Sequence, residues 1–109
     1  MSELVPEVED GYPTDATLEC IQKWDCVGKE AKLALMKYIS QAWWMPSFGW
    51  SQEDFVDDFG DAGVKYSLST GGWSGNEDLI GAMQKNFLFW GLSWVQSRRG
   101  GHYIFEVTC

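Results

Sequence analysis

Residues 64–86 read VKYSLSTGGWSGNEDLIGAMQKN, and a change of hydrophobic period within this stretch decides the fold class. Apolar and polar residues alternate from Val64 to Thr70, which predicts a strand with Tyr66 and Leu68 on one face. A glycine-rich connection follows, and a helix is then expected over about residues 77–86. This helix would turn three apolar residues inward, namely Leu79, Ile80 and Met83.

The residues that follow predict a β-hairpin. Phe87 to Ser97 is long, apolar and aromatic, Arg98-Arg99-Gly100-Gly101 is a turn signal, and His102 to Thr108 alternates again. On the first strand one face would hold Trp90, Leu92 and Trp94. On its partner one face would hold Tyr103, Phe105 and Val107.

Two helices are expected before the first strand. Thr14 can cap a helix over about residues 15–26, with Asp15 in its positively polarised first turn. Lys29 to Trp44 contains no glycine or proline, and its apolar residues recur at spacings of three and four, so they form one stripe. This helix should end at Met45-Pro46, because a residue before proline is pushed out of the helical region.

Residues 46–63 leave two interpretations open. Ser51 and Asp54 have the spacing of a capping box before Phe55, Val56 and Phe59, which favours a short helix over 52–59. A loop with aromatic anchors fits the same residues.

The expected fold class is therefore α+β, with N-terminal helices packed on a three-stranded antiparallel sheet. Residues 1–13 hold two prolines and four acidic residues and predict an extended acidic arm, and residues 14–109 form a single α+β domain. A chain of 109 residues is too short for two domains. Most of the seven tryptophans should build the core, and Trp50 and Trp73, each beside a glycine in a loop, are the expected exceptions.

The charge distribution limits the partners. The chain has a net charge of −8; residues 1–63 hold 13 acidic and 4 basic residues, whereas residues 64–109 hold 3 acidic and 4 basic residues. Such a surface repels phosphates and anionic lipids, so we expect no direct nucleic-acid partner and no membrane partner. No apolar run approaches the roughly 18 residues of a membrane span, and the acidic start lacks a secretion signal.

The cysteines and the histidine argue against a bound metal. The three cysteines, Cys20, Cys26 and Cys109, form no CxxC pair, and the chain has one histidine. Cys20 and Cys26 are six residues apart, which on a helix gives poor disulfide geometry. We therefore expect no metal, no cofactor and a reducing, cytoplasmic location.

Two motifs carry a resemblance. Residues 69–78, STGGWSGNED, and residues 98–103, RRGGHY, together with Phe89-Trp90 and Trp94, resemble small uncharacterised proteins encoded by bacteriophages and prophages. The resemblance covers about residues 36–106 and carries no catalytic assignment. It implies a phage origin and hence a role in the cytoplasm of the bacterial host, where small acidic phage proteins often bind host proteins such as defence nucleases.

The glycine-rich loop is one candidate site. Backbone N–H groups at a helix N-terminus can bind an anion, although neither the P-loop pattern nor the dinucleotide fingerprint is present. Ser74 and Glu77 have capping-box spacing and Asn76 is a rival cap, so a purely structural turn competes with this interpretation. If the loop meets the basic hairpin tip, the candidate ligand-binding residues are Trp73, Ser74, Asn76, Glu77, Arg98, Arg99 and His102.

Glu77 would there be a salt-bridge partner of an arginine or a general base. Ser74 has a single histidine available and no orienting acid beyond Glu77, so a hydrolytic site lacks a convincing nucleophile. The chain is therefore not expected to be an enzyme.

The second candidate is an acidic patch that would bind a partner, made of Glu53, Asp54, Asp57, Asp58 and Asp61. An array of carboxylates can occupy a basic surface meant for phosphates, while a solvated face that keeps the protein soluble is the alternative. We expect a non-enzymatic acidic protein that inhibits a host defence or nucleic-acid-binding protein, in the manner of an anti-CRISPR. The alternatives are a small-ligand or nucleotide-binding protein at the glycine-rich loop, and a virion accessory protein that assembles through exposed aromatic residues.

Overall fold

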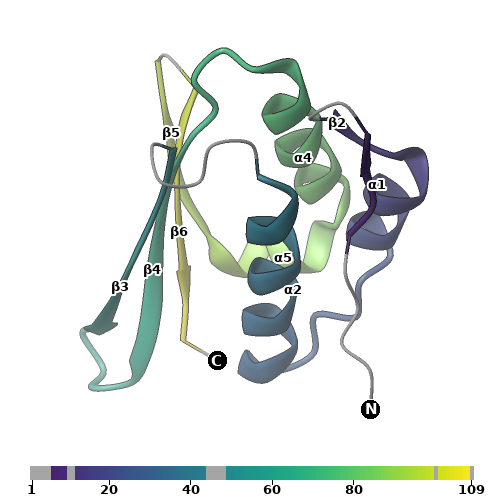
Figure 1. The fold of residues 1–109 in the computed structure, drawn as a ribbon. Coiled ribbons are helices and arrows are strands. Elements are labelled where there is room, and N and C mark those ends of the chain that lie inside the picture. The colour runs from purple at the N-terminus through teal and green to yellow at the C-terminus, as the bar shows by residue number, and fades with distance from the viewer. Residues whose placement is uncertain (1–5, 10–11, 44–48, 100, 109) are drawn as a thin grey trace.

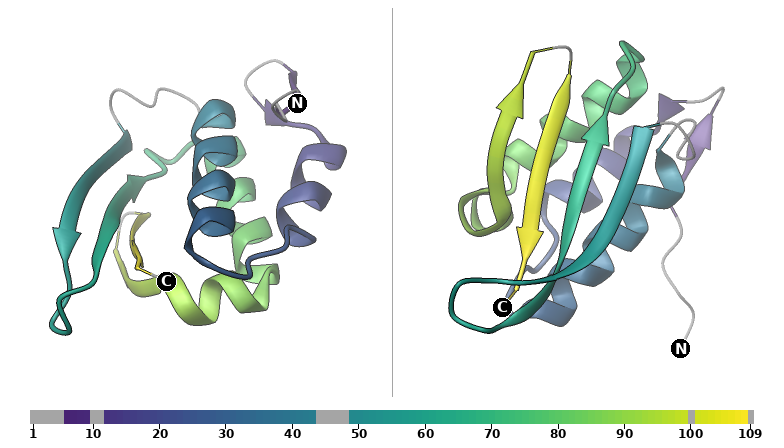
Figure 2. Two further views of the ribbon diagram at one scale, coloured as in Figure 1. Left: turned by 90° about the horizontal axis from the view of Figure 1, so that it is seen from below. Right: turned by 90° about the vertical axis from the view of Figure 1, so that its left-hand side faces the viewer.

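Helices and an antiparallel sheet form two layers in the computed structural model, which describes residues 6–9, 12–43, 49–99 and 101–108. The helices are α1 (Asp15–Gln22), α2 (Lys29–Ala42), α4 (Ser74–Lys85) and α5 (Phe87–Ser93). The strands are β1 (Val8–Glu9), β2 (Tyr12–Pro13), β3 (Trp50–Val56), β4 (Ala62–Ser69), β5 (Trp94–Arg98) and β6 (His102–Val107). The expected α+β class is confirmed. In Figures 1 and 2, α2 lies against the sheet and α1 lies farther out.

The larger sheet has four strands in the order β3-β4-β6-β5, not the expected three. Two hairpins, β3–β4 and β5–β6, are joined by antiparallel pairing of β4 with β6, from Val64 opposite Val107 to Ser69 opposite His102. The helices cover one face of the sheet, and the right panel of Figure 2 shows the other face, which we call the open face, with no helix over it.

The fourth strand, β3, corrects the expectation of a short helix over 52–59 or a loop. The sequence does not predict this strand because all seven of its residues are exposed or only partly buried, and only Trp50 packs against the core cluster. An edge strand that extends beyond the core has no buried face, so its sequence lacks a clear two-residue period. The expected helix boundary at Met45-Pro46 lies outside the described residues.

The expected strand over Phe87 to Ser97 is also corrected, because Phe87–Ser93 is helix α5 and only Trp94–Arg98 is a strand. Asn86 sets this boundary: its side-chain oxygen accepts a hydrogen bond from the Phe89 backbone N–H at 3.2 Å. The sequence pattern predicted a strand here because α5 is apolar on both its buried and its exposed sides. A short helix of this kind has the same continuous apolar run as a buried strand.

The remaining helices start close to the expected positions. Thr14 caps α1, as expected, and its side chain accepts from the Thr17 N–H. The expected caps of α4 are wrong: its N-cap is Trp73, no side chain caps it, and the Glu77 N–H donates to the Trp73 carbonyl. Asn76 is buried instead, and its side chain donates to the Thr70 carbonyl at 3.4 Å.

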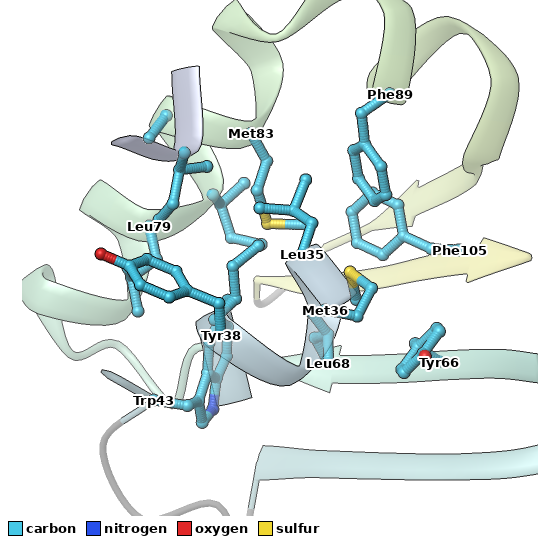
Figure 3. Packing of buried hydrophobic residues seen from close by; sticks show 14 of the residues in the cluster. Leu35, Met36, Tyr38, Trp43, Tyr66, Leu68, Leu79, Met83, Phe89 and Phe105 are labelled. Carbon is cyan, nitrogen blue, oxygen red and sulfur yellow. The ribbon is translucent and has the colours of Figure 1, made fainter. Parts of the chain in front are cut away.

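The core lies between the sheet and the helices. Figure 3 shows Leu35 and Met36 of α2 close to residues from α4, α5 and the strands. Phe89 of α5 packs on Phe105 of β6 with ring centroids 5.7 Å apart. Burial in this cluster raises the pKa of Tyr66 to about 12.

The tryptophans divide differently from expectation. Trp43 is buried, while Trp50 is half-buried and packs edge-on against Trp43 and Tyr66. Trp73 is half-buried and stacks on Tyr12 of β2, with ring centroids 4.9 Å apart. Trp50 is therefore wrong as an expected exception, whereas Trp73 lies outside the core cluster, as expected. The most exposed described tryptophan is Trp94, at 42%. The Trp73–Tyr12 stack also places part of the expected N-terminal arm against the domain.

Asn86 ties the two halves of the chain together. It ends α4 and begins α5, and its buried amide donates to the carbonyls of Ile21 and Trp24, each at 3.0 Å. Replacing Asn86 with alanine removes a helix cap and the side-chain donor of two carbonyls, of which that of Ile21 keeps only the Trp24 N–H, so we expect the free energy of unfolding to fall by about 3 kcal/mol. Urea denaturation measures this loss. The neighbouring exposed change Gln84→Ala should stay within about 0.5 kcal/mol, and an equally small effect of Asn86→Ala would contradict the assignment.

Gly101 and Gly72 provide a matched pair of glycines. Both have positive φ, 78° and 76°, but a Cβ at Gly101 would collide with the Thr70 hydroxyl oxygen, whereas a Cβ at Gly72 meets nothing within 4 Å. Gly72→Ala should therefore cost only the backbone strain, about 1 kcal/mol, and Gly101→Ala should cost at least about 1 kcal/mol more. The midpoints of urea unfolding compare the two, and equal losses would show that Thr70 does not pack against Gly101 as described.

Candidate functional site

The two motifs singled out in the sequence meet at the end of the β4–β6 ladder. Ser69 is paired with His102, and the next backbone N–H, that of Thr70, donates to the Gly101 carbonyl at 3.0 Å. Gly101 is required here because of its positive φ and because its backbone lies against the Thr70 side chain. The glycine-rich loop and the hairpin tip are thus neighbours through their backbones.

Their side chains do not converge as expected. Trp73 turns to Tyr12, Asn76 is buried beneath the loop, and Ser74 and Glu77 are exposed on α4. Within the described part of the chain, Glu77 forms no ion pair with either arginine of the tip. The expected salt bridge of Glu77 is therefore absent.

Two of the seven residues, Arg98 and His102, line a groove of about 340 Å³. The described residues that line it are Ser67, Leu68, Ser69, Arg98, His102, Tyr103 and Ile104. Arg98 is paired with His102, and His102 with Ser69, so the three form one row across three strands. The row lies on the open face, since Tyr66 and Leu68, which alternate with the serines of β4, are buried on the helix side.

The chemistry of this groove is that of anion binding. Arg98 supplies a permanent charge and five donors, His102 a titratable ring, and Ser67 and Ser69 hydroxyl groups. Among the described lining residues there is no carboxylate that could orient the imidazole of a His102–Ser69 pair for nucleophilic catalysis. Sequence reasoning missed the two serines, although the expected strand already placed them on its polar face; Arg99 is exposed and outside the lining.

The acidic patch separates into two parts. Glu53 and Asp54 are consecutive in β3 and therefore point to opposite faces of the sheet, with Glu53 paired with Lys65. Asp57, Asp58 and Asp61 lie in the turn between β3 and β4, which we call the acidic tip (residues 57–61). Figure 1 shows this hairpin reaching past the end of α2, at the lower left.

The acidic tip is held by the Asp57 side chain. One of its carboxylate oxygens accepts from the backbone N–H groups of Phe59 and Asp61, both at 2.9 Å. Two backbone bonds of 3.0 Å, from Asp57 N–H to the Asp61 carbonyl and from Gly60 N–H to the Asp57 carbonyl, close the turn. Gly60 has a φ of 86°, which suits glycine. The turn is thus organised by its own first residue.

Phe59 is the middle residue of the acidic tip and is 91% exposed. Sequence reasoning placed it as an anchor of a short helix or loop, and that expectation is wrong. Its only available signal was the turn composition around it, Asp57-Asp58-Phe59-Gly60-Asp61, which is typical of a tight hairpin connection.

A second groove, of about 390 Å³, runs between α2 and the hairpin. Its lining is Lys29, Leu33, Asp54, Phe55, Val56, Ala62, Gly63 and Val64. Lys29 crosses it and donates from Nζ to the Ala62 carbonyl at 2.8 Å. The turn end of the hairpin is thereby tethered to the start of α2, at the residue that directly follows the acidic tip.

Within the residues that the structure describes, no group of three His, Cys, Asp or Glu side chains is placed to hold a metal ion, and Cys20 and Cys26 are free thiols. None of the described helices is long and apolar enough to cross a membrane. No protein family, curated protein or solved structure matches this chain.

Proposed function

We propose that this chain is a non-enzymatic binding protein that docks its acidic tip onto a basic surface of a host protein and thereby blocks that surface. The observation that carries the proposal is the Asp57-held turn, which presents Asp58, Asp61 and the 91% exposed ring of Phe59 together. The target class is a defence or nucleic-acid-binding protein in the bacterial cytoplasm, as the resemblance to phage proteins implies.

The shape of the tip supports this function. An exposed aromatic ring among charged groups is costly in water unless a partner covers it, and aromatic residues are the commonest anchors of protein interfaces. The two bonds to the Asp57 carboxylate limit the conformations of the turn before binding. The turn therefore loses less conformational entropy on association, which favours affinity.

The charge of the chain supports it as well. The half of the chain that contains the tip has a net charge of −9, which would steer it toward a basic surface and repel nucleic acid. Carboxylates spaced along a protruding hairpin can occupy the positions that phosphates take on such a surface.

The test uses variants that leave the turn intact. Asp57 is unsuitable because its carboxylate closes the turn, so charge is removed with Asp58→Asn and Asp61→Asn together. The partner is first isolated by affinity pull-down from a lysate of the infected host. We expect the Kd for this host protein to rise about tenfold at low salt, with a weaker dependence on salt, because two steering charges are lost. The matched control, Glu77→Gln with Asp78→Asn, removes the same charge from α4. Isothermal titration at two salt concentrations compares them, and equal losses would show that only net charge matters.

Phe59→Ser separates anchoring from steering. Removal of the ring should raise the dissociation rate about tenfold or more while the association rate changes little, because the charges remain. Surface plasmon resonance measures both rates. An unchanged dissociation rate would show that Phe59 does not anchor the complex, and it would contradict docking through the acidic tip.

The groove at Arg98 and His102 favours a second candidate function, the binding of a small anionic ligand such as a nucleotide. With adenosine monophosphate as the probe, we expect the melting temperature to rise with probe concentration. Arg98→Ala should abolish the rise, whereas Arg99→Ala, outside the groove lining, should retain it. No shift in the unmodified protein, or equal loss in both variants, would reject this candidate.

A further inference from the structure

Strand β3 forms one edge of the four-stranded sheet, as the right panel of Figure 2 shows. All seven of its residues pair with β4 in one unbroken register, from Trp50 opposite Leu68 to Val56 opposite Ala62. The strand contains neither proline nor glycine. β3 is therefore a long and regular edge, and an edge of this kind can be extended by another strand.

The turn after β3 fixes which of its backbone groups point outward. The Asp57 N–H donates inward, to the Asp61 carbonyl at 3.0 Å, and the direction of the backbone groups alternates along an antiparallel strand. By this alternation, the N–H and C=O groups of Gln52, Asp54 and Val56 point away from β4. Within the part of the chain that the structure describes, these outward groups have no hydrogen-bond partner. They can therefore pair with a strand from another molecule.

The acidic side chains of β3 decide which strand can approach. Glu53 and Asp54 are consecutive, so one carboxylate lies on each face of the sheet. Glu53 lies opposite Lys65 without an ion pair between them, and the described residues provide no ion pair to the Asp54 side chain either. Both carboxylates repel an acidic strand, including that of a second copy of this chain, and both attract a basic one.

The groove between α2 and the hairpin adds apolar surface beside this edge. Asp54 and Val56 point to the helix side of the sheet, as the buried Tyr66 and Leu68 of β4 do, and they line the groove together with Leu33 of α2. Val56 is 64% exposed although it is apolar. A strand added to β3 would place alternate side chains on this side, where they meet Val56 and the groove.

We propose that an extended basic segment of the host protein pairs with the outer edge of β3 and adds a fifth strand to the sheet. This inference rests on the proposed function, since the partner is the protein that the acidic tip binds. The tip follows β3 directly, so its carboxylates continue the acidic surface of Glu53 and Asp54. In this mode of recognition backbone hydrogen bonds provide affinity and the alternating side chains provide specificity.

The positions on β3 define the sequence of that segment. Basic residues opposite Glu53 and Asp54 must be consecutive, because these two acidic residues are consecutive. The residue opposite Val56 is two positions away from the one opposite Asp54 and should be apolar, because it faces Val56 and the groove. The expected pattern is therefore basic-basic-any-apolar, in either direction along the segment.

A synthetic peptide tests strand addition without the host protein. The peptide Thr-Val-Thr-Lys-Lys-Thr-Val-Thr, with both termini blocked, has the expected pattern in both directions. Hydrogen exchange measured by NMR should show that the amide groups of Gln52, Asp54 and Val56 become protected as this peptide is added. The amide groups of β5, at the opposite edge of the sheet, should exchange as before.

Asp54→Pro and Asp54→Thr form a matched pair of variants. Both remove the same charge, but proline also removes the outward N–H and obstructs an approaching strand, and an edge strand tolerates proline at such a position. We expect Asp54→Thr to raise the Kd for the peptide about threefold, and Asp54→Pro to raise it at least about tenfold more. Urea unfolding checks that both variants fold, and the exchange experiment on the unmodified protein does not depend on either.

Strand addition is overturned if the peptide leaves the outward amide groups unprotected, or if the two variants bind it equally. The same exchange experiment on the complex with the isolated host protein separates this inference from the proposed function. Binding that is weakened by Asp58→Asn with Asp61→Asn, in a complex whose outward β3 amides stay unprotected, would retain tip docking and overturn strand addition. Protected β3 amides in a complex that these tip variants do not weaken would support strand addition and overturn tip docking.

Discussion

The pairing of β4 with β6 is the interaction on which the rest of the structure depends. β3 is attached to the sheet only through β4, and β5 only through β6, so this one ladder turns two separate hairpins into a layer that can cover the helices. A two-stranded hairpin alone is marginal in water. The close approach of Gly101 to Thr70 marks the end of the ladder and fixes where the glycine-rich loop turns away toward α4.

Sequence reasoning recovered the elements whose periodicity reflects a buried face. The strand at Val64 and the helix at Lys29 were placed within a few residues, because both bury one side and expose the other. It failed where burial gives no such pattern. β3 has little buried surface on either face, and α5 is apolar on both sides, so neither has the period of its own secondary structure.

The candidate sites were also predictable only in part, because the residues that share a site depend on how distant strands pair. The meeting of the two glycine motifs was foreseen as a possibility, but Trp73 and Asn76 serve the packing of the loop rather than a ligand. Register decides which side chains share a face, and register depends on pairing between distant strands. The row of Ser69, His102 and Arg98 therefore emerges only once β4, β5 and β6 are aligned.

The hydrogen bonds of Asn86 have a consequence for biosynthesis. The carbonyls of Ile21 and Trp24 receive their donor from a residue that is made more than sixty positions later. The first half of the chain leaves the ribosome with 13 acidic residues that repel one another and with α1 lacking both this donor and the α4 surface on which it packs. Contacts so distant in sequence form late. α1 can therefore reach its final place only after α4 and Asn86 have emerged.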